Sequence, residues 1–584
     1  MFVYTLGLFA VALYLGLRYV YSYWARHGVA HLRPEIPYGN LRALAEKRES
    51  FGVAVNQLYD RSTERIVGVY LFFRPALLVR DAHLAKRIMV ADFQHFHDRG
   101  VYCDEHRDPM SANLFALPGA RWKRLRAKLT PTFTSGQLRQ MMATFLDVSQ
   151  KLLKLLEPAA AEGRLVDMRD IASRYVLNVV ASVFFGFEAN CLADPNDPFV
   201  QALHDVNNPS SFMNNIRSAG VFMCPGLLKL TGLSSVPPEM RRFAMDVITS
   251  QIEHRERNPH DCRKDFIQLL IDLRRETDHE DRLTIAQCAA NVFLFYVAGA
   301  DTSIGVISFT LHELTHNPAA MAKVRQEIDA VLQRYGGAIS YESLRELKYL
   351  DLCPVLNRIC TEDYPVPDSD IVVRAGTQVI IPLLGISMDE KYFPEAHVYS
   401  PERFDEQAPG YDTDAYYPFG LGPRNCIGLR QGIILSKIGF VLMLSRFDFQ
   451  ATVPKRVRFE PANVTLQMEG GLPMSIALRA DRNKLLSPRR LLGGLAKAAR
   501  LGAAAAAAAP VAVRHPYCVT VATEAADVLL VAAALAAVWH ARFVSSWLMR
   551  SSIRYCATLI AFGWPVMVTI RLRVPGAKMP FFEI

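Results

Sequence analysis

The stretch from Phe419 to Gly428 decides the fold, and it reads Phe-Gly-Leu-Gly-Pro-Arg-Asn-Cys-Ile-Gly. Gly420 and Gly422 allow the backbone to turn tightly, so that Cys426 is presented near the end of a loop. Residues 429–444 then show helical periodicity, and the positive end of a helix dipole favours a thiolate. The pattern therefore predicts that Cys426 is an anionic metal ligand.

Two other interpretations fit parts of this loop. A buried cysteine at a loop-to-helix junction can be chemically inert, and Gly420-x-Gly422 begins like a dinucleotide-binding GxGxxG loop. The dinucleotide pattern fails because position 425 is Asn, where the third glycine would stand. Since several fixed positions must agree at once, the loop favours a haem-thiolate site.

A second stretch, residues 283–311, contains no proline, and Asp301 is its one charged side chain. The small residues Ala298 and Gly299 let a flat cofactor or a diatomic molecule approach the backbone. Asp301 and Thr302 place an acid beside a hydroxyl, and such a pair can relay protons. A membrane-spanning helix with a single carboxylate is the alternative, although a carboxylate there would itself be a sign of function.

Together these stretches resemble the cytochrome P-450 family of haem-thiolate monooxygenases, and more closely its insect microsomal branch. The resemblance runs from the N-terminus to about residue 480, and it includes residues 92–100 (Asp-Phe-Gln-His-Phe-His-Asp-Arg-Gly) and 129–136 (Leu-Thr-Pro-Thr-Phe-Thr-Ser-Gly). It implies a mainly α fold with a small β region, in which haem (iron protoporphyrin IX) lies between two long helices. Cys426 would be the axial iron ligand, with Asp301 and Thr302 delivering protons for oxygen activation on the opposite face.

Further haem contacts follow from the resemblance. Trp122 and Arg126 are four residues apart, so a helix would place them on one face, and a basic solvated helix is the usual explanation of such a run. The resemblance instead assigns both to the haem propionates, which suit the bidentate geometry of Arg, and it adds Arg358 and Arg424. The other implied haem-binding positions are Ala298, Gly299, Phe419, Gly422 and Gly428.

The resemblance also implies partners. Electrons would come from NADPH through a separate NADPH-cytochrome P-450 reductase, and the substrate would be a lipophilic small molecule. Basic residues around the cysteine loop could form a face for an acidic reductase. These residues are Lys123, Arg124, Lys128, Arg430 and Lys437.

The N-terminus predicts membrane attachment. Residues 1–17 carry no charged side chain, and arginines and aromatic residues follow, so residues 1–24 are expected to form a signal-anchor helix. A proline-rich hinge is expected over residues 25–40. The positive-inside rule predicts that residues 41–480, the expected haem domain, lie in the cytosol, and the resemblance implies that the membrane is that of the endoplasmic reticulum.

Residues 481–584 form an Ala-rich, partly hydrophobic C-terminal extension of unknown role. They hold 13 Lys and Arg against four Asp and Glu, which accounts for the whole-chain excess of 66 basic over 57 acidic residues. Because the rest of the chain is neutral, no nucleic-acid partner is expected. The ten scattered cysteines do not form the framework of a small disulfide-rich protein, so we expect a reducing compartment.

One motif points to a different class of enzyme. Residues 312–316 read His-Glu-Leu-Thr-His, the HExxH pattern of helical zinc hydrolases. The candidate third ligands, by position alone, are Glu327, Glu342 and Glu346. The motif stands just before Asn317-Pro318, where a polar, exposed helix end is expected, so a zinc hydrolase is the less favoured interpretation.

The resemblance breaks at one place. The family carries a Glu-x-x-Arg pair after a segment like residues 348–351, and here residues 352–354 lead directly into Val355, without the pair, which indicates a deletion near 352–354. Glu342 and Arg345 match the four-letter pattern but precede that segment, as a surface coincidence would. Arg403 would then lose an acidic partner. A non-catalytic or misfolded relative is therefore the alternative function.

Overall fold

The computed structural model describes residues 2–208, 211–258, 265–275, 282–345, 355–404, 409–461 and 464–480. The chain divides into two compact units, Met1–Ala499 and Arg500–Ile584. The second unit, the C-terminal extension 481–584 and the deletion expected near 352–354 all lie outside the described residues.

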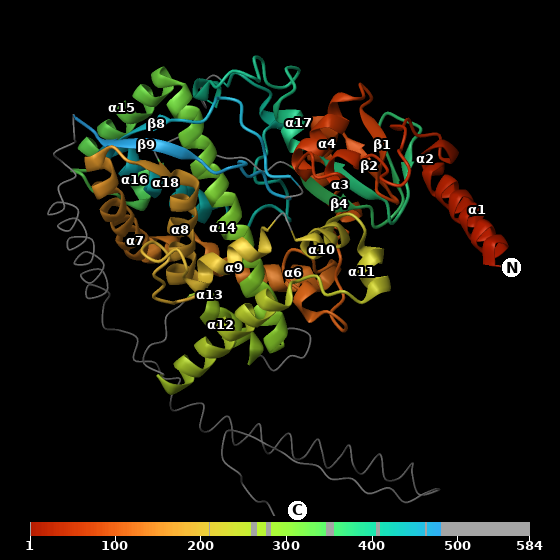
Figure 1. Ribbon diagram of the computed structural model, residues 1–584, viewed down its shortest axis with the longest axis horizontal. Helices are drawn as coiled ribbons and strands as arrows, with labels where there is room; N and C mark the ends of the chain where they lie inside the picture. Colours follow the sequence, from red (N-terminus) through yellow and green to blue (C-terminus); the bar gives the residue numbers. More distant parts are fainter. Residues whose placement is uncertain are drawn as a thin grey trace, which may run out of the picture. The chain divides into compact units, whose positions relative to one another are not determined.

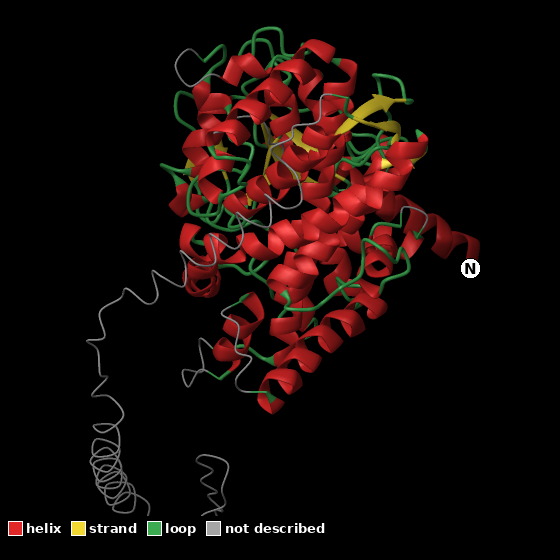
Figure 2. Cartoon of the chain, turned by 90° about the vertical axis from the view of Figure 1, so that its left-hand side faces the viewer, coloured by secondary structure: helices red, strands yellow, loops and turns green. Residues whose placement is uncertain are grey.

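Helices make up most of the described part, and the strands are short (Figure 2), so the prediction of a mainly α fold with a small β region is confirmed. The helices are α1 (Phe2–Tyr21), α2 (Tyr23–Arg26), α3 (Arg42–Ala45), α4 (Phe51–Asp60), α5 (Ala82–Met89), α6 (Gly119–Leu129), α7 (Ser135–Glu162), α8 (Met168–Val179), α9 (Pro198–Val206), α10 (Phe212–Phe222), α11 (Pro225–Thr231), α12 (Pro238–Arg257), α13 (Phe266–Arg274), α14 (Ile285–His316), α15 (Pro318–Arg334), α16 (Tyr341–Arg345), α17 (Leu383–Ser387) and α18 (Leu429–Arg446).

The longest helix, α14, is the centre of the larger hydrophobic core. It begins with a capping box between Thr284 and Gln287, and it ends at Asn317 because Pro318 starts the next helix. Helices α8, α12, α13 and α18 pack against it, and Figure 1 shows it running through the middle of the helical region. Helix α14 is long and apolar enough to cross a membrane. Its packing identifies it as a core helix instead.

The strands form one four-stranded sheet and two smaller ones. In the first sheet, the order β1-β2-β7-β4 joins Ile66–Leu71, Arg74–Val79, Gln378–Ile381 and Leu356–Ile359, and only the β2–β7 pair is parallel. The second sheet has the order β3-β9-β8, from Leu165–Asp167, Pro473–Leu478 and Phe447–Ala451. The third pairs β5 (Tyr364–Pro365) with β6 (Val372–Val373). Strand β4 carries Arg358, one of the residues predicted to contact haem.

The N-terminal helix α1 leads away from the four-stranded sheet in Figure 1. Most of its described apolar side chains are exposed, in contrast to the buried apolar faces of the core helices, and Tyr21 at its end is buried. The exposed residues are Tyr4, Leu8, Val11, Tyr14, Leu15 and Tyr19. Trp24, in α2, is buried, and its indole Nε1 donates to the carbonyl of Val69 in β1 at 3.0 Å. The chain that follows α1 is therefore packed against β1 through Trp24.

Candidate functional site

The cysteine loop is a closed turn that ends at α18. The Cys426 amide donates to the carbonyl of Phe419 at 2.9 Å, so the two ends of the loop are hydrogen-bonded to each other. Gly428 is the N-cap residue of α18, two positions after Cys426, so the positive end of the helix dipole lies beside the thiol. The side chain of Cys426 is exposed rather than packed in the core. The interpretation as an inert buried cysteine is therefore wrong.

Gly422 is required by the path of the loop. Its φ is +70°, and a Cβ added there would lie 1.9 Å from the carbonyl oxygen of Met89. The neighbouring Gly420 also has a positive φ of +71°, but an added Cβ would lie 3.3 Å from its nearest neighbour, Leu356. The glycine pattern thus reflects both the left-handed backbone and a close approach of the end of α5.

We expect Gly422→Ala to displace the loop and weaken cofactor retention. The collision with a backbone oxygen and the left-handed conformation each cost about 1–3 kcal/mol. Gly432→Ala is the matched control, because nothing lies within 4 Å of an added Cβ there. Thermal unfolding and the metal or cofactor content of both variants check this. Equal behaviour of the two alanine variants would contradict it.

Helix α6 contacts the loop through the two residues that the spacing placed on one face. Arg126 donates to the backbone carbonyl of Asn425 at 3.0 Å and to its side-chain Oδ1 at 2.9 Å. The guanidinium of Arg424 lies over the ring of Trp122, 4.0 Å from its centroid. Both residues therefore position the segment immediately before Cys426.

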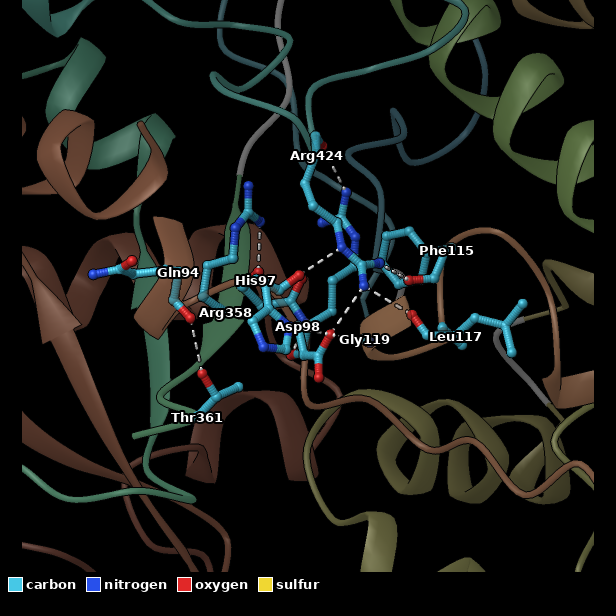
Figure 3. Close-up of polar contacts among 12 residues, drawn as sticks. Gln94, His97, Asp98, Phe115, Leu117, Gly119, Arg358, Thr361 and Arg424 are labelled. Carbon is cyan, nitrogen blue, oxygen red and sulfur yellow. Dashed lines mark hydrogen bonds and ion pairs between the residues drawn. The ribbon is translucent and has the colours of Figure 1, made fainter. Parts of the chain in front are cut away.

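Arg424 is buried and hydrogen-bonded on all sides. It donates to the carbonyls of His97 at 2.7 Å, Leu117 at 2.8 Å and Phe115 at 3.3 Å, and to the carboxylate of Asp98 at 3.2 Å (Figure 3). Burial, followed by the positive charge of a neighbouring arginine, lowers the pKa of Arg424 to about 9. Residues within the segment 97–117 thus bind the guanidinium group of Arg424 through hydrogen bonds.

Arg358, on β4, is fully buried without enough partners. Its Nη1 donates to its neighbour's carbonyl, that of Asn357, at 2.8 Å. Its Nε and Nη2 are buried, and neither has a hydrogen-bond partner in the part of the chain that the structure describes. Burial, with the charges of Arg99 and Arg424, holds the pKa of Arg358 well below its usual range. Buried guanidinium donors without acceptors are costly, so this arrangement suits an anion with several oxygen atoms.

Four arginines therefore surround one region. Figure 3 shows Arg358 and Arg424 with His97 and Asp98 beside them. The charges of Arg99 and Arg126 both lower the pKa of Arg424, and the charge of Arg99 also lowers the pKa of Arg358. The sequence singled out Arg126, Arg358 and Arg424, and the structure brings all three together from segments more than 60 residues apart along the chain. The cluster can bind a ligand that carries two carboxylates.

Helix α14 exposes a different set of groups. Ala298 and Thr302 are exposed although the helix is otherwise mostly covered, and the Thr302 hydroxyl donates to the carbonyl of Ala298 at 2.7 Å. A Cβ added to Gly299 would lie 3.9 Å from Val180, so this residue faces the neighbouring element rather than the Ala298–Thr302 side. One face of α14 thus presents a methyl group and a hydroxyl.

Asp301 is buried, in contrast to its neighbour Thr302. Its Oδ1 accepts from Asn207 Nδ2 at 2.7 Å and from Gln467 Nε2 at 3.4 Å. Burial raises the pKa of Asp301 to about 6, and the hydrogen bond from Asn207 and the charge of Arg169 oppose this rise. A carboxyl group with this pKa can both give and take a proton near neutral pH.

The histidines of the HExxH motif contact backbone carbonyls. His312 Nε2 lies 3.0 Å from Lys455 O, and His316 Nε2 lies 3.1 Å from Val453 O. Glu346, one of the candidate third ligands, lies outside the described residues. No group of three or more metal-ligating side chains occurs among the described residues. The expected exposed helix end is wrong for His312, which is buried because the segment that precedes β9 covers it.

The partners of Arg403 among the described residues are backbone carbonyls. Arg403 donates to the carbonyls of Pro394 and Glu395 at 2.7 Å and of Val398 at 3.1 Å, so it is not the unpaired buried charge that the missing pair would leave. Glu342 forms an ion pair with Arg139 at 2.9 Å, with both side chains about half exposed, which agrees with a surface role. Neighbouring carbonyls therefore bind the guanidinium of Arg403.

Sequence reasoning missed the role of several residues at this site. Asp98 and Arg99 lie in a stretch that was matched to the family without any assigned task, and Asn207 and Gln467 carried no motif at all. The adjacent acid and arginine in an otherwise aromatic segment were the one available signal for Asp98. Nothing local marks an amide as the partner of a carboxylate some 94 residues away.

Comparisons with known proteins agree with this site. The cytochrome P450 family model matches residues 34–471. Cytochrome P450 6d3 of Musca domestica is 40% identical over 487 residues, covering 77% of this chain and 93% of the relative. Probable cytochrome P450 6d5 of Drosophila melanogaster is 38% identical over 506 residues, covering 82% and 99%. With the cysteine loop and the arginine cluster in place, these matches show that the chain belongs to the cytochrome P450 family.

Proposed function

We propose that this chain is a haem-thiolate monooxygenase that inserts one atom of dioxygen into lipophilic small molecules. Family membership implies haem, a reductase partner and a hydrophobic substrate. The observation that carries the proposal is Arg358, whose buried and unpartnered nitrogens lie in the same arginine cluster as the residues that hold the Cys426 loop.

The residues present fit haem. Its two propionates would supply the acceptors that Arg358 Nε and Nη2 lack among the described residues. Arg126, Arg424 and Trp122 hold the loop beside that position. Cys426 would provide the thiolate ligand. Ala298 and Thr302, which are exposed on α14, would border the cofactor. Phe419, Gly422 and Gly428 shape the loop that carries the ligand.

When bound, haem would supply the iron at which dioxygen is activated by the incoming electrons. The chain's own residues would prepare and protect that reaction. Cys426 would donate negative charge to the metal, and the arginine cluster would fix the orientation of the cofactor. The hydroxyl of Thr302 would donate a proton, and the buried carboxyl group of Asp301 would replace the proton that Thr302 gives up. Asn207 and Gln467 would keep the carboxyl group of Asp301 in place.

This proton route predicts a pH dependence. If the protonated form of Asp301 is the donor, product formed per NADPH consumed falls as pH rises through about 6. Asp301→Asn should give a low yield that is flat with pH. Asn207→Leu should move the midpoint to higher pH, because the hydrogen bond from Asn207 lowers the pKa of Asp301. Product and NADPH measured from about pH 5 to 8 check this. An unchanged midpoint in Asn207→Leu would contradict the role of that hydrogen bond.

The same carboxyl group links pH to folding. The pKa of Asp301 is raised in the folded chain, so the unfolded chain releases this proton at lower pH, and stability declines as pH rises from about 4 to about 6. Asp301→Asn should remove that decline. The stability of Asp301→Asn relative to that of the parent protein is therefore expected to be higher at pH 7 than at pH 4. Thermal unfolding at the two pH values measures it.

Electrons are proposed to arrive from NADPH through NADPH-cytochrome P-450 reductase. Helices α6 and α18 flank the cysteine loop and carry the basic side chains expected there. Lys123 and Arg430 are exposed, so they offer positive charge on the side of the loop from which a reductase would approach. The rate of reduction should therefore fall with increasing salt.

We further propose attachment to the endoplasmic reticulum membrane through residues 1–24, with the catalytic domain in the cytosol. The exposed apolar side chains of α1 support this, since water does not stabilise such a surface. Residues 25–40 would be the hinge and residues 41–480 the haem domain. Residues 481–584 would be an appended extension.

A labelling experiment tests the proposed function. The full chain, reconstituted with haem, reductase and NADPH under isotopically labelled dioxygen, should convert a lipophilic probe to a product that carries one labelled oxygen atom. NADPH oxidation that yields only reduced oxygen species and no labelled product would contradict it, and would support the non-catalytic alternative. The deletion of the family's Glu-x-x-Arg pair, which the sequence predicts, makes this outcome informative.

A further inference from the structure

We propose that Asp98 is a positioning residue for haem, which joins the three elements that carry the propionate-binding arginines and sets the charge of their cluster. The inference rests on the proposed haem-thiolate function. It concerns a residue that touches neither iron nor substrate, and it makes predictions that the proposed function alone does not make.

The contacts of Asp98 reach three separate elements. Its Oδ1 accepts from the amide of Gly119 at 2.7 Å, at the first residue of α6, which carries Trp122 and Arg126. The same oxygen accepts from Nη2 of Arg424, on the cysteine loop, at 3.2 Å. Figure 3 shows Asp98 between these partners. One carboxylate oxygen thus fixes α6 relative to the loop.

The backbone of Asp98 makes the third connection. Its carbonyl accepts from the amide of Ile359 at 2.9 Å, one residue after Arg358 on β4. The neighbouring residue His97 lies with Nδ1 2.8 Å from the Asp98 carboxylate, and its carbonyl accepts from Arg424. Displacing residue 98 would therefore disturb Arg358, Arg424 and the start of α6 together.

Charge balance explains why an acid stands here. Arg99, Arg126, Arg358 and Arg424 bring four positive charges, and Asp98 brings one negative charge that lies directly against Arg424. The two propionates of haem would bring two more negative charges. A carboxylate at this place binds the buried guanidinium of Arg424 and leaves the Nε and Nη2 donors of Arg358 for the cofactor.

The role in charge can be separated from a role in folding. A carboxylate beside haem stabilises the oxidised iron, whose charge is more positive, so removing its charge should raise the reduction potential. A residue that only supports the fold would change stability and haem retention, but it would leave the potential of the correctly folded holoprotein unchanged. The potential is therefore the deciding readout.

The experiment compares three variants of the full chain loaded with haem. Asp98→Asn removes the charge with little change of shape, and Asp98→Glu keeps the charge but changes its reach. Asp92→Asn is the matched control, because Asp92 also pairs with an arginine, Arg87, and its side chain has the same 16% exposure as that of Asp98. For each, the midpoint potential and the rate of haem transfer to an excess of haem-free myoglobin are measured.

Asp98→Asn should show a higher potential than the parent protein and a haem loss faster by about tenfold or more, the scale expected for a charge-assisted hydrogen bond. Asp98→Glu should lose haem faster but keep the parent potential, and Asp92→Asn should match the parent in both. The proposal is overturned if Asp98→Asn and Asp92→Asn have the same potential. If the parent chain itself lacks a thiolate-ligated haem, the proposed function fails first, and the parent spectrum shows this separately.

Discussion

Cys426→Ala is expected to abolish oxygenation while leaving the fold intact. The side chain is exposed, and substitutions at such positions usually change stability by less than about 0.5 kcal/mol. The loss would therefore come from the missing thiolate, which is the negative ligand at the metal. Product formation and thermal unfolding of the variant, each compared with the parent, check the two halves of this expectation.

His316→Ala is the control that separates the haem and zinc interpretations. His316 contacts the carbonyls of His312 and Val453, so its removal should cost about 1 kcal/mol of stability and little activity. An inactive His316→Ala variant together with an active Cys426→Ala variant would contradict the haem-thiolate assignment. No chelator sensitivity is expected for either variant.

Arg358→Met is expected to change stability and cofactor binding in opposite directions. Without a ligand, the guanidinium is buried with two unpartnered nitrogens among the described residues, so replacing it with an apolar side chain should stabilise the haem-free protein by about 1–3 kcal/mol. The same change removes a charged donor from the propionates, and haem affinity should fall by about 10–100-fold. Thermal unfolding of the haem-free protein and haem titration measure the two effects.

Arg255→Met is the matched control for this experiment. Arg255 is also a buried arginine, but it is paired with Asp265 at 2.6 Å. Breaking that pair leaves a buried carboxylate alone, so this variant should lose about 3–5 kcal/mol. Haem-free protein that is destabilised in both variants would contradict the view that Arg358 waits for an anionic ligand.

The parts that the sequence could predict are local. The cysteine loop depends on ten consecutive residues, and the left-handed backbone at Gly420 and Gly422 follows from residue type. Helix α14 could be predicted from a long apolar stretch with Thr284 at its start and Pro318 after its end. In each case residues close in sequence carry the signal, although the close approach of Met89 to Gly422 could not be predicted from them.

The parts that could not be predicted depend on contacts between distant segments. Asp98 meets Arg424 from 326 positions away, and Asn207 meets Asp301 from 94 positions away. The burial of His312 follows from a later segment that crosses the end of α14, which no helix-end signal could indicate. The backbone carbonyls that Arg403 contacts carry no sequence signal, because every residue offers one.

The spectrum of the reduced, carbon-monoxide-treated full chain tests the central claim most directly. A thiolate from Cys426 pushes electron density onto the iron, so we predict the red-shifted Soret band that distinguishes thiolate-ligated haem. A band typical of haem with a neutral ligand, or a chain that binds no haem when haemin is supplied during expression, would contradict the account.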